Sequence, residues 1–147
     1  MIYLPRIVGA RASAPEPPQA FASGTERVLF VDDEEMQVRA MDNLLQHLGY
    51  NVVGLSDPRA ALELFRRDPG AFDLAIMDQS MPQMLGIELA REILRIRPGF
   101  PIILCTGYSE TLKEEEALEA GVAAFMFKPF SVKEIAGMIR RVLPSGN

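Results

Sequence analysis

The chain has 147 residues, of which 48% are hydrophobic and 24% are charged, and this composition suits one globular domain and excludes two full ones. Its single cysteine, Cys105, cannot form an internal disulfide, which excludes a disulfide-rich secreted module and favours the cytoplasm. The 15 Lys and Arg against 20 Asp and Glu give a net charge of −5, the wrong sign for direct nucleic-acid binding. No segment approaches the roughly 18 apolar residues that span a bilayer, so we expect a soluble chain with no membrane contact through this segment.

The first 26 residues differ in composition from the rest. Residues 1–8 contain a short strand-like run, Ile2–Val8, with no neighbouring strand to pair with. Residues 9–26 are rich in Ala, Pro, Ser and Gly and contain too few large apolar groups to offset the entropy of ordering, so they are predicted to form a flexible linker. Residues 27–143 are long enough to bury one core and are predicted to be the folded domain.

Five short apolar runs within this domain predict β-strands. Apolar residues in them do not alternate with polar ones, which is typical of parallel strands that are buried on both faces. The five predicted strands are Val28–Val31, Asn51–Leu55, Leu74–Met77, Ile102–Cys105 and Ala124–Phe127.

The segments between the strands carry apolar residues three and four positions apart, which predicts helices. Strands that alternate with helices, joined by right-handed crossovers, predict a three-layer α/β/α sandwich around a parallel sheet. The segments Ser56-Asp57-Pro58 and Ser131-Val132-Lys133-Glu134 are predicted helix N-caps, the second with capping-box spacing. The helix predicted over Glu110–Ala120 has the thinnest apolar stripe, so it should pack most loosely.

Polar residues follow four of the five predicted strands. Asp32 and Asp33 follow the first, Asp78 the third, Thr106 the fourth and Lys128 the fifth. The carboxyl ends of parallel strands share one edge of a sheet, so these side chains should lie close together.

This grouping predicts a particular chemistry. Crowded carboxylates repel one another unless a cation is present, and oxygen ligands suit Mg²⁺. A carboxylate in such a site can attack phosphorus, while Lys128 balances the remaining negative charge and Thr106 donates to a phosphoryl oxygen.

Four motifs, in this order and spacing, are similar to those of a known family. Together they resemble the receiver domain of bacterial two-component response regulators, the CheY-like family, over residues 27–143. The motifs are Asp32-Asp33-Glu34, then Asp78-Gln79-Ser80-Met81-Pro82 continuing to Gly86, then Thr106-Gly107, and finally Phe125-Met126-Phe127-Lys128-Pro129-Phe130. The resemblance implies a flavodoxin-like fold with a five-stranded parallel sheet in the order 2-1-3-4-5.

The resemblance also implies roles for the acidic residues. Asp78 would be the phosphoacceptor, phosphorylated by a histidine kinase or a histidine phosphotransfer protein. Asp33, Asp78 and the backbone carbonyl of Ser80 would bind Mg²⁺, and Asp32 would bind it through water.

Thr106 and Lys128 would contact the phosphoryl group, and the Lys128–Pro129 peptide would be cis. Phe125 occupies the family's aromatic switch position, so Thr106 and Phe125 would form the switch. A downstream protein would then bind the face formed by the fourth helix, the fifth strand and the fifth helix.

The front of the chain resembles the junction that precedes the C-terminal receiver of hybrid sensor histidine kinases. Residues 1–8 would be the remnant of a kinase ATP-binding domain, and the stretch Leu104–Glu110 is similar to that subgroup. We expect the domain to assist its own phosphorylation and dephosphorylation but to turn over no separate substrate.

Two alternatives remain open. One is an unphosphorylated receiver-like protein-interaction module. The other is an aspartate-nucleophile phosphohydrolase, although such an enzyme usually has a second acid two positions after the nucleophile, where this chain has Ser80.

Overall fold

The structure is a computed structural model that describes residues 26–107 and 114–143. Three predicted features lie at least partly outside the described residues. They are the strand-like run Ile2–Val8, residues 9–25 of the predicted linker, and the start of the helix predicted at Glu110–Ala120. Within the described ranges, no helix has both the length and the apolar character needed to cross a membrane.

The strands form a single parallel sheet. Its order, β2-β1-β3-β4-β5, confirms the predicted topology. β3 and β4 each extend one residue beyond the predicted strand, because Asp78 still pairs with Cys105 and Thr106 with Phe127. The strands are β1 (Arg27–Val31), β2 (Asn51–Leu55), β3 (Leu74–Asp78), β4 (Ile102–Thr106) and β5 (Ala124–Phe127).

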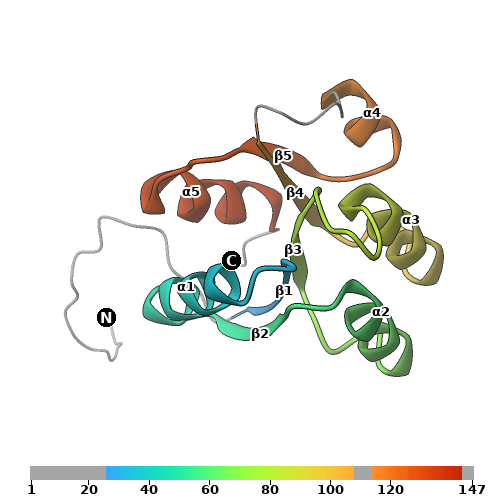
Figure 1. Ribbon diagram of the computed structural model, residues 1–147, viewed down its shortest axis with the longest axis horizontal. Coiled ribbons are helices and arrows are strands. Elements are labelled where there is room, and N and C mark those ends of the chain that lie inside the picture. Colours follow the sequence, from blue (N-terminus) through green and yellow to red (C-terminus); the bar gives the residue numbers. More distant parts are fainter. Residues whose placement is uncertain (1–25, 108–113, 144–147) are drawn as a thin grey trace, which may run out of the picture.

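Helices cover both faces of the sheet. α1 and α5 lie on one face, and α2 and α3 lie on the other, with α4 beside β5 (Figure 1). This arrangement confirms the three-layer sandwich. The helices are α1 (Glu35–His47), α2 (Pro58–Arg67), α3 (Gly86–Ile96), α4 (Glu114–Glu119) and α5 (Val132–Val142).

Two hydrophobic clusters fill the space between these layers. Phe65 and Phe100 anchor the cluster under α2 and α3, where their rings pack edge to face. Leu45 and Ile139 belong to the cluster under α1 and α5. Every residue of β3 and β4 is buried, so the ends of these central strands are held in fixed positions.

Local signals set the helix ends. The Asp57 side chain accepts a hydrogen bond from the Arg59 N–H, and Ser131 and Glu134 form a reciprocal capping box, so both predicted N-caps are confirmed. Gly49 has a φ of 99° just after α1, a backbone conformation that favours glycine.

Glu26, the last residue of the predicted linker, contacts the folded domain. Its carbonyl accepts a hydrogen bond from the Asn51 N–H at 3.0 Å, and its carboxylate lies 3.3 Å from Nη1 of Arg140 on α5. These contacts fix where the chain enters the sheet.

Candidate functional site

The sheet brings the predicted site residues to one edge. Asp32 follows β1 directly, Asp78 ends β3, Thr106 ends β4 and Lys128 follows β5. The strand order places β1 and β4 on either side of β3, so Asp78 lies at the centre of the group. Strand direction and order therefore account for how residues far apart in sequence come together.

Three carboxylates form a compact acidic cluster. Oxygen atoms of Asp32, Asp33 and Asp78 all lie within 4.8 Å of one another. Asp32 and Asp78 are 2% and 4% exposed, whereas Asp33 is partly exposed. Hard cations bind such sets of oxygen ligands, so the geometry fits a metal ion of this class.

The environment of Asp32 shows the energetic cost of this cluster. Burial raises the pKa of the Asp32 carboxyl, and the negative charge of Asp78 raises it further. A hydrogen bond from the Glu34 N–H and the charge of Lys128 oppose the rise only in part. A bound cation would remove this repulsion.

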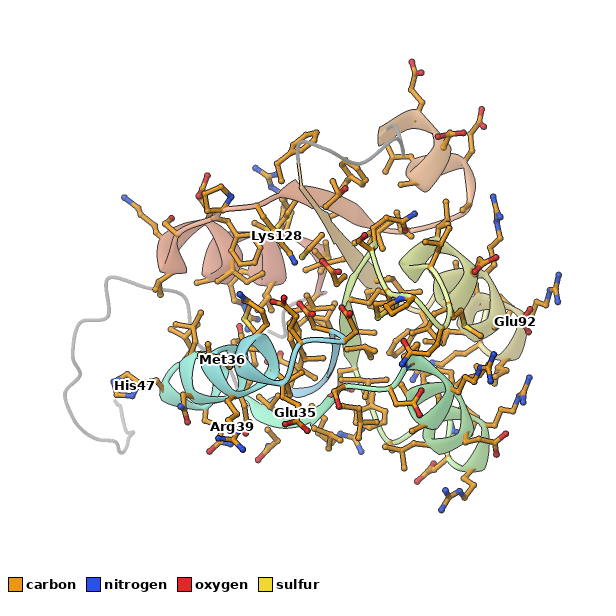
Figure 2. All side chains as sticks on the ribbon, viewed as in Figure 1. Glu35, Met36, Arg39, His47, Glu92 and Lys128 are labelled. Atoms are coloured by element: carbon orange, nitrogen blue, oxygen red, sulfur yellow. The ribbon has the colours of Figure 1, made fainter. Side chains whose placement is uncertain are left out.

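Lys128 supplies positive charge at the site. Its ammonium forms an ion pair with Oδ1 of Asp78 and lies 3.6 Å from Oδ2 of Asp32. Burial alone would lower the pKa of Lys128, but the hydrogen bond and charge of Asp78, with the charge of Asp32, raise it above its ordinary value. In Figure 2, Lys128 lies between α5 and α1.

The charges of these residues do not balance. Within the part of the chain that the structure describes, one ammonium faces the three carboxylates of the cluster, which leaves two negative charges in excess. A divalent cation would neutralise that excess.

Backbone groups orient the two buried carboxylates. The Ser80 N–H donates to Oδ2 of Asp78 at 3.1 Å, and the Glu34 N–H donates to Oδ1 of Asp32 at 3.0 Å. Both carboxylates are thereby fixed by the loops that follow their own strands. The predicted role of the Ser80 carbonyl as a metal ligand stays a prediction.

The two predicted switch residues lie on the neighbouring strands β4 and β5. Thr106 is 1% exposed, and its hydroxyl donates to the Gly107 carbonyl at 3.4 Å. Phe125 is buried, and its ring packs edge-on against that of Phe127, with 5.3 Å between centroids. The Lys128–Pro129 peptide is cis, as the family resemblance implies.

A pocket of about 290 Å³ adjoins the ion pair. Met41 of α1, Phe130 and Cys105 contribute apolar walls to it, and Lys128 and Asp78 contribute polar ones. Burial raises the pKa of the Cys105 thiol to about 12. Cys105 therefore stays a neutral thiol at physiological pH and has no thiolate to act as a nucleophile.

Gln79 and Gly86 were named from the sequence within a family motif but were assigned no role, and both shape the site. Gln79 is 6% exposed, and its side-chain oxygen accepts a hydrogen bond from the Ile87 N–H at 2.9 Å. Gly86 has no space for a side chain, because a Cβ there would lie 2.4 Å from the Asp78 carbonyl oxygen. The sequence did hold two signals that these residues shape the site. Gln79 places an amide side chain directly after a buried strand, and Gly86 places a glycine at the start of a helix.

Comparison with known proteins gives a consistent family assignment. Residues 28–140 match the family described as "Response regulator receiver domain". A solved structure described as a response regulator receiver domain protein from Clostridium thermocellum is 26% identical, with a TM-score of 0.76, over 80% of this chain and 93% of that one.

Curated relatives extend the comparison. A probable transcriptional regulator, ycf27, of Guillardia theta is 37% identical over 83% of this chain and 47% of its own length. The alkaline phosphatase synthesis transcriptional regulatory protein PhoP of Bacillus subtilis is 31% identical over 80% of this chain and 48% of its own length. The chain thus spans about half the length of these two relatives.

Proposed function

The chain belongs to the response regulator receiver domain family, and we propose on that premise that Asp78 accepts a phosphoryl group from a phosphohistidine. One observation carries the proposal. The side chains of Asp32, Asp33, Asp78 and Lys128 meet at one edge of the sheet, although they come from three segments that lie far apart in the sequence. That set of charges suits the transfer of a phosphoryl group to a carboxylate.

In the proposed reaction, a carboxylate oxygen of Asp78 attacks the phosphorus of the phosphohistidine. A phosphorus–oxygen bond forms, the phosphorus–nitrogen bond breaks, and the electron pair of that bond stays on the ring nitrogen. The other ring nitrogen of the reacting phosphohistidine carries a proton throughout, so the imidazole leaves as neutral histidine. The product is an acyl phosphate on Asp78. The ion pair with Lys128 and the hydrogen bond from the Ser80 N–H hold the Asp78 carboxylate in position for this attack.

The acidic cluster would hold the metal ion. We assign Asp33, Asp78 and the Ser80 carbonyl as ligands of Mg²⁺ and Asp32 as a contact through water, and the excess of negative charge at the cluster supports this assignment. Mg²⁺, when bound, would neutralise charge on the phosphoryl oxygens.

Lys128 and Thr106 would act on the transferred group. The ammonium of Lys128 contacts both Asp32 and Asp78, so it lies where it can reach an oxygen of a phosphoryl group on Asp78. The Thr106 hydroxyl now donates to the Gly107 carbonyl and could turn to a phosphoryl oxygen instead.

That turn would be the start of the switch. If the Thr106 hydroxyl moves toward the phosphoryl group, space opens behind the Thr106 side chain. The ring of Phe125 can fill that space, and the packing of Phe125 against Phe127 then changes. Phe127 is half exposed, so the change reaches the surface of α4, β5 and α5, where we propose that a downstream protein binds.

Acetyl phosphate, a small phosphodonor, tests the proposed function. Purified protein with Mg²⁺ and acetyl phosphate should gain one phosphoryl group that is stable in acid and labile in base, as measured by intact-protein mass spectrometry. The Asp78→Asn variant should gain none. Equal labelling of the wild type and Asp78→Asn would contradict the proposal. If the wild type is labelled neither by acetyl phosphate nor by a cognate kinase, the result would favour the unphosphorylated interaction module.

We also propose a cytoplasmic histidine kinase or phosphotransfer protein as the donor, and a hybrid kinase as the source of the chain. The second proposal rests only on the resemblance of the front of the chain, since the curated relatives above are described as regulators. The genomic reading frame upstream of Met1 tests it. A continuous frame that encodes an ATP-binding kinase domain is expected, and an in-frame stop codon just upstream would contradict it.

A further inference from the structure

Gln79, the residue directly after the proposed phosphoacceptor, is a buried polar side chain that the proposed mechanism does not use. It is 6% exposed, between the end of β3 and the start of α3. Polar side chains buried to this degree are costly unless they are hydrogen-bonded, so the contacts of Gln79 indicate its role.

The side chain of Gln79 caps α3 from across the loop. Leu85, the N-cap residue of α3, has an apolar side chain that cannot accept a hydrogen bond. Oε1 of Gln79 instead accepts from the Ile87 N–H at 2.9 Å, in the first turn of α3. Gln79 therefore takes the place of the Ser, Thr, Asp or Asn that usually satisfies a helix N-terminus.

The backbone of Gln79 closes the same loop. Its carbonyl accepts from the Gly86 N–H at 3.0 Å and from the Met81 N–H at 3.2 Å, while its own N–H donates to the Cys105 carbonyl at 2.8 Å. The loop from Gln79 to Gly86 is thus tied to the start of α3 and to β4. A Cβ at Gly86 would clash with the Asp78 carbonyl, so the two ends of this loop are as close as backbone allows.

Ser80 lies inside this closed loop. Its N–H donates to Oδ2 of Asp78, and its carbonyl is the proposed backbone ligand of the metal ion. The position of both groups depends on the loop that Gln79 ties to α3. When a residue that orients the ligands of a metal ion in this way is removed, the affinity of the site for the metal ion falls.

We propose that Gln79 is a positioning residue: its hydrogen bond to the Ile87 N–H fixes the loop after β3, and thereby sets the affinity of the acidic cluster for a divalent cation. This inference rests on the proposed function, because it takes Asp78 and the Ser80 carbonyl as ligands. Gln79 itself contacts neither the cation nor the phosphoryl group.

The test is the affinity of the full chain for MgCl₂, measured by isothermal titration calorimetry. Gln79→Met keeps the length of the side chain and removes the acceptor, so the dissociation constant should rise about 10- to 100-fold. Gln79→Glu keeps an oxygen at the same place and adds negative charge, so it should bind Mg²⁺ at least as tightly as the wild type. Exchange of the Ile87 amide hydrogen with solvent should be faster than in the wild type for Gln79→Met but not for Gln79→Glu.

Asp57→Ala is the matched control, because it also removes a side-chain acceptor from a helix N-terminus, that of α2, without touching the acidic cluster. It should lower the melting temperature and leave Mg²⁺ affinity unchanged. The inference is overturned if Gln79→Met binds Mg²⁺ as the wild type does, if Gln79→Glu is as weak as Gln79→Met, or if Asp57→Ala weakens binding equally.

Labelling with acetyl phosphate separates this inference from the proposed function. If the wild type is not labelled at Asp78 but Gln79→Met still shows the specific loss of Mg²⁺ affinity, the proposed function fails and the positioning role stands. If the wild type is labelled and Gln79→Met binds Mg²⁺ normally, only the positioning role fails. A wild type that binds no Mg²⁺ overturns the positioning role.

Discussion

The backbone N–H of Lys128 donates a 2.7 Å hydrogen bond to the carbonyl of Thr106. This bond extends the pairing of β4 with β5 by one step beyond Thr106 and Phe127. The two side chains that we assign to the phosphoryl group therefore leave adjacent strand ends whose backbones are directly joined. Their spacing is a property of the sheet rather than of a free loop.

The ammonium of Lys128 should matter for the rate of phosphorylation. Lys128→Met removes the charge that faces Asp78 and Asp32 and should slow labelling of Asp78 by acetyl phosphate about 100-fold, the usual effect of losing one charge-stabilising donor. Initial rates from intact-protein mass spectrometry measure this. Lys133→Met, on the exposed side of α5, is the control and should label at the wild-type rate. Equal rates for both variants would contradict the assigned role.

Mg²⁺ should stabilise the fold through the acidic cluster. At a free Mg²⁺ concentration about ten times the dissociation constant, binding adds about 1.4 kcal/mol to the free energy of unfolding, which raises the melting temperature by about 5 °C. Asp33→Ala should fold, as judged by circular dichroism, but should show neither this rise nor labelling of Asp78. Chelation should likewise stop labelling of the wild type. A rise of equal size with NaCl at matched ionic strength would show that the effect is not metal binding.

Much of this site could be predicted because strand direction determines where residues meet. Asp32, Asp78 and Lys128 each follow or end an apolar run, so a parallel sheet must bring them to one edge. The N-caps Asp57 and Ser131 could be predicted because capping is local in sequence.

The role of Gln79 could not be predicted in this way. Its partner is the N–H of Ile87, and nothing in the spacing of these residues shows that the loop folds back far enough for them to meet. The same holds for Glu26 and Arg140, whose ion pair joins the chain entrance to α5. Such contacts depend on the packed structure and not on a local pattern.

Gly86 should be intolerant of any side chain. A Cβ at this position would lie 2.4 Å from the Asp78 carbonyl oxygen and 2.9 Å from Cα of Gln79, both backbone atoms that cannot turn away. Gly86→Ala should therefore destabilise the protein by about 1–3 kcal/mol, measured by urea unfolding. Gly137→Ala is the matched control on α5, where a Cβ meets no described atom within 4 Å, and it should stabilise by about 0.5–1 kcal/mol. A higher free energy of unfolding in both variants than in the wild type would refute the close contact at Gly86.

Asp73 should give the protein a small dependence of stability on pH. Burial alone would raise the pKa of Asp73, but hydrogen bonds from the N–H and guanidinium of Arg27, with the charge of Arg97, lower it below the ordinary value of 3.8. A lowered carboxyl pKa contributes stability that is present above 3.8 and is lost as pH falls through the value in the folded protein.

The variant Asp73→Asn measures this contribution. The pair is partly exposed, so the variant should lose only about 0.5 kcal/mol of unfolding free energy at pH 7. In urea titrations the difference from the wild type should shrink below pH 3.8 as Asp73 becomes protonated. A difference that stays constant down to pH 2.5, or one that grows in acid, would contradict the assigned shift.

The most direct test of the account is to locate the phosphorylated residue chemically. Borohydride reduces an aspartyl phosphate to homoserine, and peptide mass spectrometry then identifies the position. After incubation with Mg²⁺ and a phosphodonor that labels the protein, the account predicts homoserine at position 78 and at no other aspartate. Homoserine at Asp32 or Asp33, or labelling on another type of residue, would contradict it.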